Sequence, residues 1–455
     1  MLIELLNSNM RQPRPNRGLR RISTAALCSL ILLVYPSLAA LARQNSKIGP
    51  LEHDRAVAMM EMLHDALKKN YYDPTFHGVD MEARYKVYLE KVKTAPTLAT
   101  ALRAIAAYLV ALDDSHTIFL PPDYSFHFDY GYRMQMIGDR SFITDVRPNS
   151  DAAAKLHPGD QVLTLDGYGL KRKDMWQLEY YLNALAPKSA TKFELLDPAG
   201  SRRTEEITTA HSAAVGIQHL SPYDRLDLYE KWRHQMRDRY VEFDDVLMWK
   251  MRGFIHTDVD IDHMIAIARK HKALILDLRG NGGGSVDTLR YLIASVMDHE
   301  VHIGTSITRK GKHPLDSNKP PKDNFTGKII VLVDSRSASA SEIFARVIQL
   351  EHRGTVMGDV SSGSVMEAQI FPMQYGTDLI IYFGAEITGA DLQMTDGNSL
   401  ERMGVTPDVL ILPTPQDLAE KRDPVLSRAA EMVGVKLDPA AAGKIFPYEW
   451  PPAPQ

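Results

Sequence analysis

A serine-rich turn offers the first side chains in this sequence that could carry out a chemical reaction. Residues 337–342 read Ser-Ala-Ser-Ala-Ser-Glu, between an apolar run and a helical pattern. Small side chains let a substrate backbone approach closely, and the free N–H groups at a helix start stabilise developing negative charge. One of these serines, of which Ser339 is the middle one, could therefore be a nucleophile. The alternative is structural, because Ser341 could simply cap the helix, as serines in such turns usually do.

A glycine-rich segment could supply the electrostatic part of the same site. Residues 277–284 read Asp-Leu-Arg-Gly-Asn-Gly-Gly-Gly directly after a short apolar run. Consecutive glycines allow positive φ angles and leave their N–H groups unshielded toward a negative oxygen. The phosphate-loop pattern G-x-x-x-x-G-K-[ST] does not occur here, so we interpret the segment as part of an oxyanion hole. The N–H groups of Gly283 and Ala340 are the candidate donors.

Two more segments contain side chains suited to proton transfer. His116, in the run Leu-Asp-Asp-Ser-His-Thr at 112–117, could accept a serine proton near neutral pH, where the unperturbed imidazole titrates. Glu401, shortly before Gly-Val-Thr-Pro-Asp at 404–408, could orient such a base. Taken alone, a single histidine or glutamate is more often structural or solvated. Neither residue identifies a site by itself.

Three kinds of element must position these side chains. Helical periodicity from about 51 to 112 predicts a small helical unit, with one apolar face made of Ala56, Met59, Met60, Leu63 and Leu67. A second face in this unit comprises Leu98, Leu102, Ile105, Leu109 and Leu112. From 245 onward, strands and helices alternate, and the apolar runs 273–276 and 329–333 are typical of a sheet buried on both faces. The polar stretch 310–328, with three prolines, is predicted to be a surface loop.

The middle of the chain, from about 131 to 210, is predicted to form short strands and turns. A strand at 142–146 precedes a short helix at 151–156, and a second strand at 161–165 lies between Gly159 and Gly167. This order resembles the second half of a PDZ domain, and the resemblance implies peptide capture by strand addition. The peptide-binding loop of such a domain is not recognisable at 131–138. A purely structural β-sandwich is the alternative.

The first 42 residues have the pattern of a secretory signal peptide. Five arginines precede an apolar run from about 25 to 40, which ends in Ala-Leu-Ala before Arg43. An uncleaved membrane anchor is the alternative, and the pair Arg20-Arg21 weakly suggests twin-arginine export. Cys28, the only cysteine, lies inside this segment. A mature chain without cysteine would have no disulfide and no thiol nucleophile.

The charge balance argues against a polyanionic partner. The chain has 53 Lys and Arg against 57 Asp and Glu, a formal net charge of −4. A net charge this small and negative would not attract nucleic acid or an acidic membrane surface. Membrane contact is therefore expected only through the N-terminal segment, if that segment is retained.

Taken in order, these segments resemble the S41 family of serine peptidases, which comprises C-terminal processing peptidases and tricorn-like peptidases. The resemblance implies a crotonase- or ClpP-like α/β peptidase core with Ser339 as nucleophile. Processing peptidases of this family activate the serine with a lysine, in a segment similar to Gly-Glu-Pro-Thr-Phe-Gly-Lys-Gly. Here 358–365 reads Gly-Asp-Val-Ser-Ser-Gly-Ser-Val, with Ser364 in place of the lysine, and no lysine occurs between Lys328 and Lys421.

The tricorn-like branch offers a replacement for the missing lysine. The site of that branch consists of a Ser-His pair, a nucleophilic serine and a glutamate. The resemblance implies that these residues are here Ser115, His116, Ser339 and Glu401. His116 would be the general base, and Glu401 would orient it either directly or through Ser115. No cofactor and no metal is called for by this chemistry.

The sequence therefore predicts an exported serine endopeptidase, periplasmic or secreted, acting on polypeptides or peptides, and homo-oligomerisation is left open. The expected parts are a signal peptide (1–42), a helical domain (43–125), a PDZ-like domain (130–212), the peptidase core (216–430) and a tail (431–455). A rival interpretation is a catalytically inactive peptide- or ligand-binding protein with a decayed peptidase core, motivated by the missing lysine. A crotonase-type acyl-thioester enzyme is a third, and the export signal argues against it.

Overall fold

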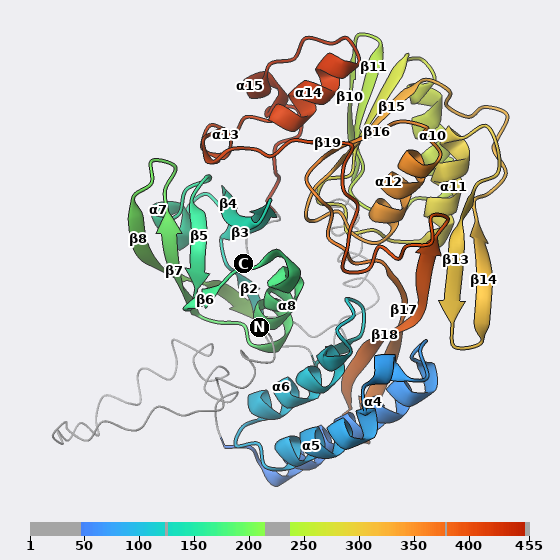
Figure 1. Cartoon of the computed structure of the whole chain (residues 1–455). Coiled ribbons are helices and arrows are strands. Elements are labelled where there is room, and N and C mark those ends of the chain that lie inside the picture. Colours follow the sequence, from blue (N-terminus) through green and yellow to red (C-terminus); the bar gives the residue numbers. More distant parts are fainter. Residues whose placement is uncertain (1–46, 123–125, 214–236, 378–379, 451–455) are drawn as a thin grey trace.

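The computed structural model describes residues 47–122, 126–213, 237–377 and 380–450 (Figure 1). The predicted signal peptide, with Cys28 and the Arg20-Arg21 pair, lies outside these ranges. Within them, no helix combines the length and apolar character needed to cross a membrane.

Three helices form the N-terminal unit, which lies at the bottom of Figure 1. The two apolar faces predicted from periodicity are confirmed, because all their residues except the partly buried Leu98 are buried. A short 3-10 turn ends this unit at Asp113, whose φ of 54° reverses the chain toward His116. The bounds are α4 (Pro50–Asn70), η1 (Phe76–Gly78), α5 (Met81–Lys93), α6 (Leu98–Leu109) and η2 (Val110–Leu112).

A five-stranded sheet connects this helical unit to the rest of the molecule. Its long central strand β18 (Ile381–Met394) pairs with β17 (Met366–Tyr375) on one side, and with β1 (Ile118–Leu120) and β13 (His302–Thr308) on the other. The prediction of a loop throughout 310–328 was wrong, because β14 (Gly311–Asp316) forms a hairpin with β13. Pro314 is tolerated there because β14 is an edge strand.

The middle of the chain forms a separate β-rich module. Its strands pair in the order β3-β4-β5-β7-β8, with β6 on β5. The expected strand, short helix and second strand are present, and Gly159 and Gly167 both have positive φ. The PDZ-like identity of this module stays a prediction. The bounds are β2 (Phe126–Asp129), β3 (Tyr132–Ile137), β4 (Arg140–Val146), α7 (Asp151–Lys155), β5 (Gln161–Leu165), β6 (Tyr168–Gly169), η3 (Arg172–Asp174), α8 (Met175–Tyr180), η4 (Tyr181–Leu185), β7 (Ala190–Leu196), β8 (Arg202–Thr208) and β9 (Ala210–Ala213).

The C-terminal half contains the α/β core that the apolar runs predicted. Its sheet has the order β10-β11-β12-β15-β16-β19, parallel from β11 onward. Helices α10, α11 and α12 cover one face and α14 the other, so β12 is buried along its whole length. The bounds are β10 (Arg239–Phe243), β11 (Val246–Lys250), α10 (Asp258–Ala268), β12 (Ala273–Asp277), α11 (Val286–Val296), β15 (Lys328–Val333), α12 (Ala340–Leu350), β16 (Thr355–Gly358), β19 (Val409–Leu410), α13 (Pro415–Ala419), α14 (Pro424–Met432) and α15 (Pro439–Ala442).

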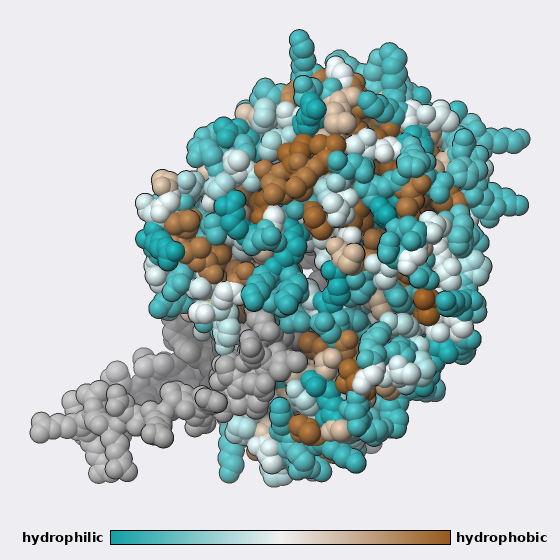
Figure 2. All heavy atoms as spheres, in the orientation of Figure 1, coloured by the Kyte–Doolittle hydropathy of each residue, from teal (hydrophilic) through white to brown (hydrophobic). Residues whose placement is uncertain are grey.

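The last described residues join the core to the β-rich module. Arg239 on β10 donates to the carbonyl of Pro447, while Arg133 of the module lies 3.9 Å from the ring centre of Tyr448. The tail therefore docks on both parts of its own chain. Figure 2 shows a mostly hydrophilic surface with an apolar patch over the β19 region, where Leu410 and Leu412 are exposed.

Candidate functional site

Ser339 lies at the N-cap of α12 in a strained backbone conformation. Its φ of 56° and ψ of −121° are unusual for a residue with a side chain. Such outliers cost on the order of 1–3 kcal/mol and persist where the surrounding structure enforces them, most often at functional sites. The turn directly follows the buried strand β15, so the serine stands at the carboxyl edge of the core sheet.

The three serines of this turn have different surroundings. Ser337 donates its hydroxyl to the carbonyl of Leu278 at 2.9 Å, and Ser341 donates to that of Asn281 at 2.8 Å. Both side chains are buried. The hydroxyl of Ser339 makes no capping hydrogen bond and has no other hydrogen-bond partner within the described part of the chain. Of the three, Ser339 alone has its hydroxyl available. Ser341 bonds to the glycine segment and does not cap α12.

The glycine segment packs directly against this turn. A Cβ atom added to Gly283 would lie 2.6 Å from the Cβ of Ser339, so only glycine fits there. The N–H of Gly283, an expected oxyanion donor, donates instead to Asn281 Oδ1 at 2.9 Å. The N–H of Ala340, the other expected donor, has no partner among the described residues and stands in the first turn of α12. Of the two expected donors, Ala340 is thus the one whose N–H is not already engaged.

His116 is held by a hydrogen-bonded relay from Glu401. Ser115 Oγ donates to Glu401 Oε2 at 2.9 Å and lies 2.7 Å from His116 Nδ1. A serine hydroxyl has one proton, and here it points to the carboxylate, so Nδ1 must carry the proton that bonds to Oγ. Nε2 is then unprotonated, as a general base requires. Of the two arrangements left open by the sequence, the structure has the one through Ser115.

The surroundings of His116 favour its neutral form. Burial lowers the pKa of His116, and the nearby carboxylate of Asp114 opposes that shift. Asp114 also fixes the turn, because one of its oxygens accepts the N–H groups of His116 and Thr117 and the hydroxyl of Thr388. Burial raises the pKa of Glu401, against the hydrogen bonds that it accepts.

Two consecutive residues connect the serine to the histidine relay. The carbonyl of Ser364 accepts the N–H of Ser339 at 2.8 Å, and the N–H of Val365 donates to Glu401 at 2.8 Å. No hydrogen bond joins Ser339 Oγ to His116 Nε2, although both atoms are without partners among the described residues. Ser364, at the position of the absent lysine, places its hydroxyl 2.9 Å from that of Ser362.

Comparisons with known proteins concern the family and the fold. Residues 242–411 match the model of peptidase family S41. This part of the chain is thus similar to peptidase family S41. The match spans the S41 core from β10 to β19, and with it the glycine segment, Ser339 and Glu401.

Named relatives of this chain include processing proteases and a tricorn protease. The chain is 25% identical over 320 residues to a tail-specific protease of Haemophilus influenzae, covering 65% of this chain and 43% of the relative. A carboxy-terminal-processing protease of Bartonella bacilliformis is 32% identical over 156 residues, or 33% of each chain. This chain thus spans less than half the length of these two relatives. A tricorn protease of Thermoplasma volcanium is 30% identical over 194 residues, 41% of this chain and 18% of the relative.

The fold also resembles a solved structure. A crystal structure of mature CPAF superimposes with a TM-score of 0.62 at 16% identity, covering 81% of this chain and 94% of that one. The expectation of a multidomain α/β fold with an S41 peptidase core is confirmed. Whether the chain belongs to the tricorn-like branch stays a prediction.

Glu342 is a residue of this S41 site that sequence reasoning missed. Its buried carboxylate accepts the N–H groups of Ser339, Gly363 and Ser364 and the hydroxyl of Ser361. Burial raises its pKa to about 7, while those hydrogen bonds act in the opposite direction. Its place three residues after Ser339, where a glutamate often bonds back to the N-cap, was the available signal.

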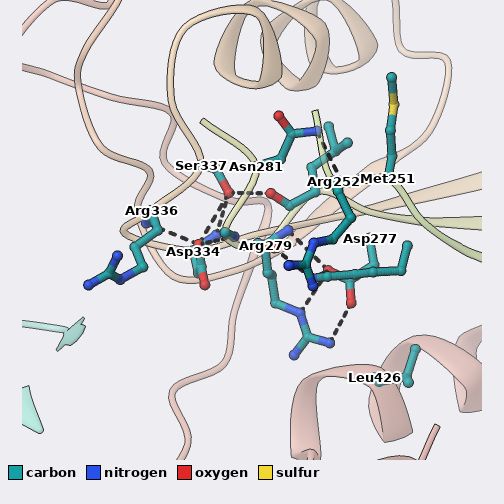
Figure 3. A network of polar contacts seen from close by, with 12 residues as sticks. Met251, Arg252, Asp277, Arg279, Asn281, Asp334, Arg336, Ser337 and Leu426 are labelled. Carbon is teal, nitrogen blue, oxygen red and sulfur yellow. Dashed lines mark hydrogen bonds and ion pairs between the residues drawn. The ribbon is translucent and has the colours of Figure 1, made fainter. Parts of the chain in front are cut away.

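A network of charged side chains includes the first residues of the glycine segment. Arg279 bonds through its guanidinium to both Asp277 and Asp423, and Lys250 bonds to Asp277 and to the carbonyl of Arg279. Figure 3 shows Asp277 and Arg279 of this network near Asp334, which accepts the backbone N–H groups of Gly280 and Arg336. Lys250 is thus committed to the network, and burial lowers its pKa.

The β-rich module closes one side of the S41 site. A cavity of about 440 Å³ is lined by Gln135, Trp176 and Arg402 together with Arg336, Ala338 and Gly363. The free edge of β3 already contacts the serine turn, because the carbonyls of its two methionines, Met134 and Met136, accept hydrogen bonds from Arg336 and Ser335. A peptide that adds to β3 would have to replace these bonds.

Proposed function

We propose that this protein is a serine endopeptidase that cleaves polypeptides through an acyl-enzyme on Ser339. The observation that carries the proposal is that Ser339 is the one serine of its turn with an available hydroxyl, in a strained conformation beside the glycine segment. The match of residues 242–411 to the S41 family model, and relatives named as proteases, support the same chemistry.

In this proposal His116 Nε2 takes the proton of Ser339 as Oγ attacks the peptide carbonyl. The N–H of Ala340 stabilises the oxyanion, a contribution of ~3 kcal/mol per donor in the transition state. The N–H of Gly283 can join it only by leaving Asn281. His116 then protonates the leaving amine, and finally activates the water that hydrolyses the ester. Glu401, acting through Ser115, stabilises the imidazolium that forms in each step.

Labelling with a fluorophosphonate tests the nucleophile. The wild-type protein and a Ser335→Ala control, changed two residues before this turn, should label, whereas Ser339→Ala should not. Labelling that persists in Ser339→Ala would disprove the assignment. An inactive binding protein, the rival suggested by the missing lysine, would bind casein peptides in every variant and hydrolyse them in none.

We also propose that the chain is exported by its N-terminal segment. The support is the basic, apolar and small-residue pattern of residues 1–42. N-terminal sequencing of the protein from a periplasmic fraction should give a start at Arg43. An intact N-terminus in a membrane pellet would show an anchor instead.

A further inference from the structure

The strand that leaves the candidate site has an unpaired edge. β17 follows directly after Ser364 and Val365, and it pairs with β18 over its ten residues. Among the described strands, none pairs with the opposite edge of β17. A long unpaired edge is a template on which another extended chain can form backbone hydrogen bonds.

The direction of the backbone groups along β17 follows from Pro372. Proline has no N–H, so in a sheet its nitrogen faces away from the neighbouring strand. The N–H and C=O groups of alternate residues in a strand point the same way, and Ala368, Ile370 and Gln374 therefore present theirs to the free edge. Phe371 and Met373 lie between them and bond toward β18, opposite Ala385 and Phe383.

The beginning of β17 lies close to the nucleophile along the chain. The register with β18 shifts between Glu367 and Ala368, and the strand begins at Met366, two residues after Ser364. The carbonyl of Ser364 accepts the N–H of Ser339, whereas the N–H of the next residue, Val365, points to Glu401. The N-terminal end of β17 therefore begins two residues after the point at which the chain bonds to Ser339.

We propose that the free edge of β17 binds the polypeptide substrate as an added strand, and so leads its scissile bond to Ser339. The inference rests on the proposed function and specifies its substrate class: an extended, unfolded segment recognised by its backbone. The ten residues of β17 would accommodate a segment about 30 Å long at roughly 3.3 Å per residue. Side chains on this edge add apolar contact, because Ile370 is 66% exposed.

Backbone methylation of the substrate tests strand pairing separately from catalysis. Mass spectrometry of β-casein digested by the wild-type protein would first identify a cleaved site, and a fluorescent twelve-residue peptide would be made around it. Its affinity for the Ser339→Ala protein is measured by anisotropy, with each peptide N–H methylated in turn. Affinity should fall about fivefold to tenfold at every second position and change little between them, since one backbone hydrogen bond is lost at a time.

Disulfide trapping locates the peptide. In a Cys28→Ser, Ser339→Ala background, Ile370→Cys should cross-link to peptides that carry a cysteine at every second position. Val259→Cys, 75% exposed on α10, is the matched control and should not.

The outcomes separate the two proposals. Casein left intact would refute the peptidase function itself. Cleavage with a uniform methylation profile, or equal trapping at both cysteines, would refute strand addition while the peptidase stands. A disulfide between two Ile370→Cys chains that excludes the peptide would mean that a second copy occupies this edge, and would overturn the inference as well.

Discussion

Removing the hydroxyl of Ser115 should separate the histidine relay from the rest of the site. In Ser115→Ala, Glu401 keeps the N–H of Ser115 at 2.9 Å and that of Val365 at 2.8 Å, so the carboxylate stays in place. What disappears is the acceptor for His116 Nδ1. The imidazole then loses both its fixed tautomer and the stabilisation of its protonated form.

The size of the effect follows from the bond that is lost. A hydrogen bond that connects to a charged group contributes about 1.5–3 kcal/mol, and 1.36 kcal/mol corresponds to a factor of ten in rate. We therefore expect kcat to fall about 10- to 150-fold in Ser115→Ala. His116→Ala, which removes the base itself, should lose about 100- to 10,000-fold.

The assay is hydrolysis of a casein-derived peptide, with kcat and KM measured separately. Ser115→Thr retains a hydroxyl and should recover much of the rate, and KM should change little because the hydroxyl of Ser115 bonds to His116 and Glu401. Full activity of Ser115→Ala would refute the relay. A large rise in KM with unchanged kcat would place Ser115 in substrate binding instead.

Three further predictions concern protonation and packing. Because burial lowers the pKa of His116 and the base must be neutral, the acid limb of kcat/KM should have its midpoint below pH 6.5, and a midpoint above 7 would contradict the assignment. The pKa of Glu342 is raised to about 7 from 4.5. Between these two pH values the folded protein therefore holds a proton on Glu342 that the unfolded chain has lost. Its contribution to stability is present below pH 4.5 and is lost as the pH rises through 7. As the pH rises from 4.5 to 8, the free energy of unfolding in urea should fall by about 3 kcal/mol more for the wild type than for Glu342→Gln. Parallel pH dependences of the unfolding free energy in the two proteins would refute this. Gly283→Ala should lower kcat at least about tenfold, because its Cβ would lie 2.6 Å from that of Ser339. Gly282→Ala is the control, because the space around Gly282 is open, and its kcat should remain near that of the wild type. Equal rates for the two variants would show that the close approach of Gly283 is unimportant.

Local patterns predicted the elements well where one physical requirement dominated. The apolar faces of α4 and α6, and the continuous apolar strands β12 and β15, follow from burial on one face or on two. The prediction failed for β14, where prolines and polar residues suggested a loop, because an edge strand has no neighbour on its outer side and tolerates both.

The sequence by itself determined the residue types of the site: a serine in a small-residue turn, a glycine segment beside it, a histidine and a glutamate, and serine at the position of the expected lysine. Only the tertiary structure decided how they connect. It placed Ser115 between His116 and Glu401, engaged the N–H of Gly283 with Asn281, and left the hydroxyl of Ser339 available. These are hydrogen bonds between segments far apart in the chain or within a turn, and their geometry depends on how the sheets bring those segments together, which no local pattern encodes.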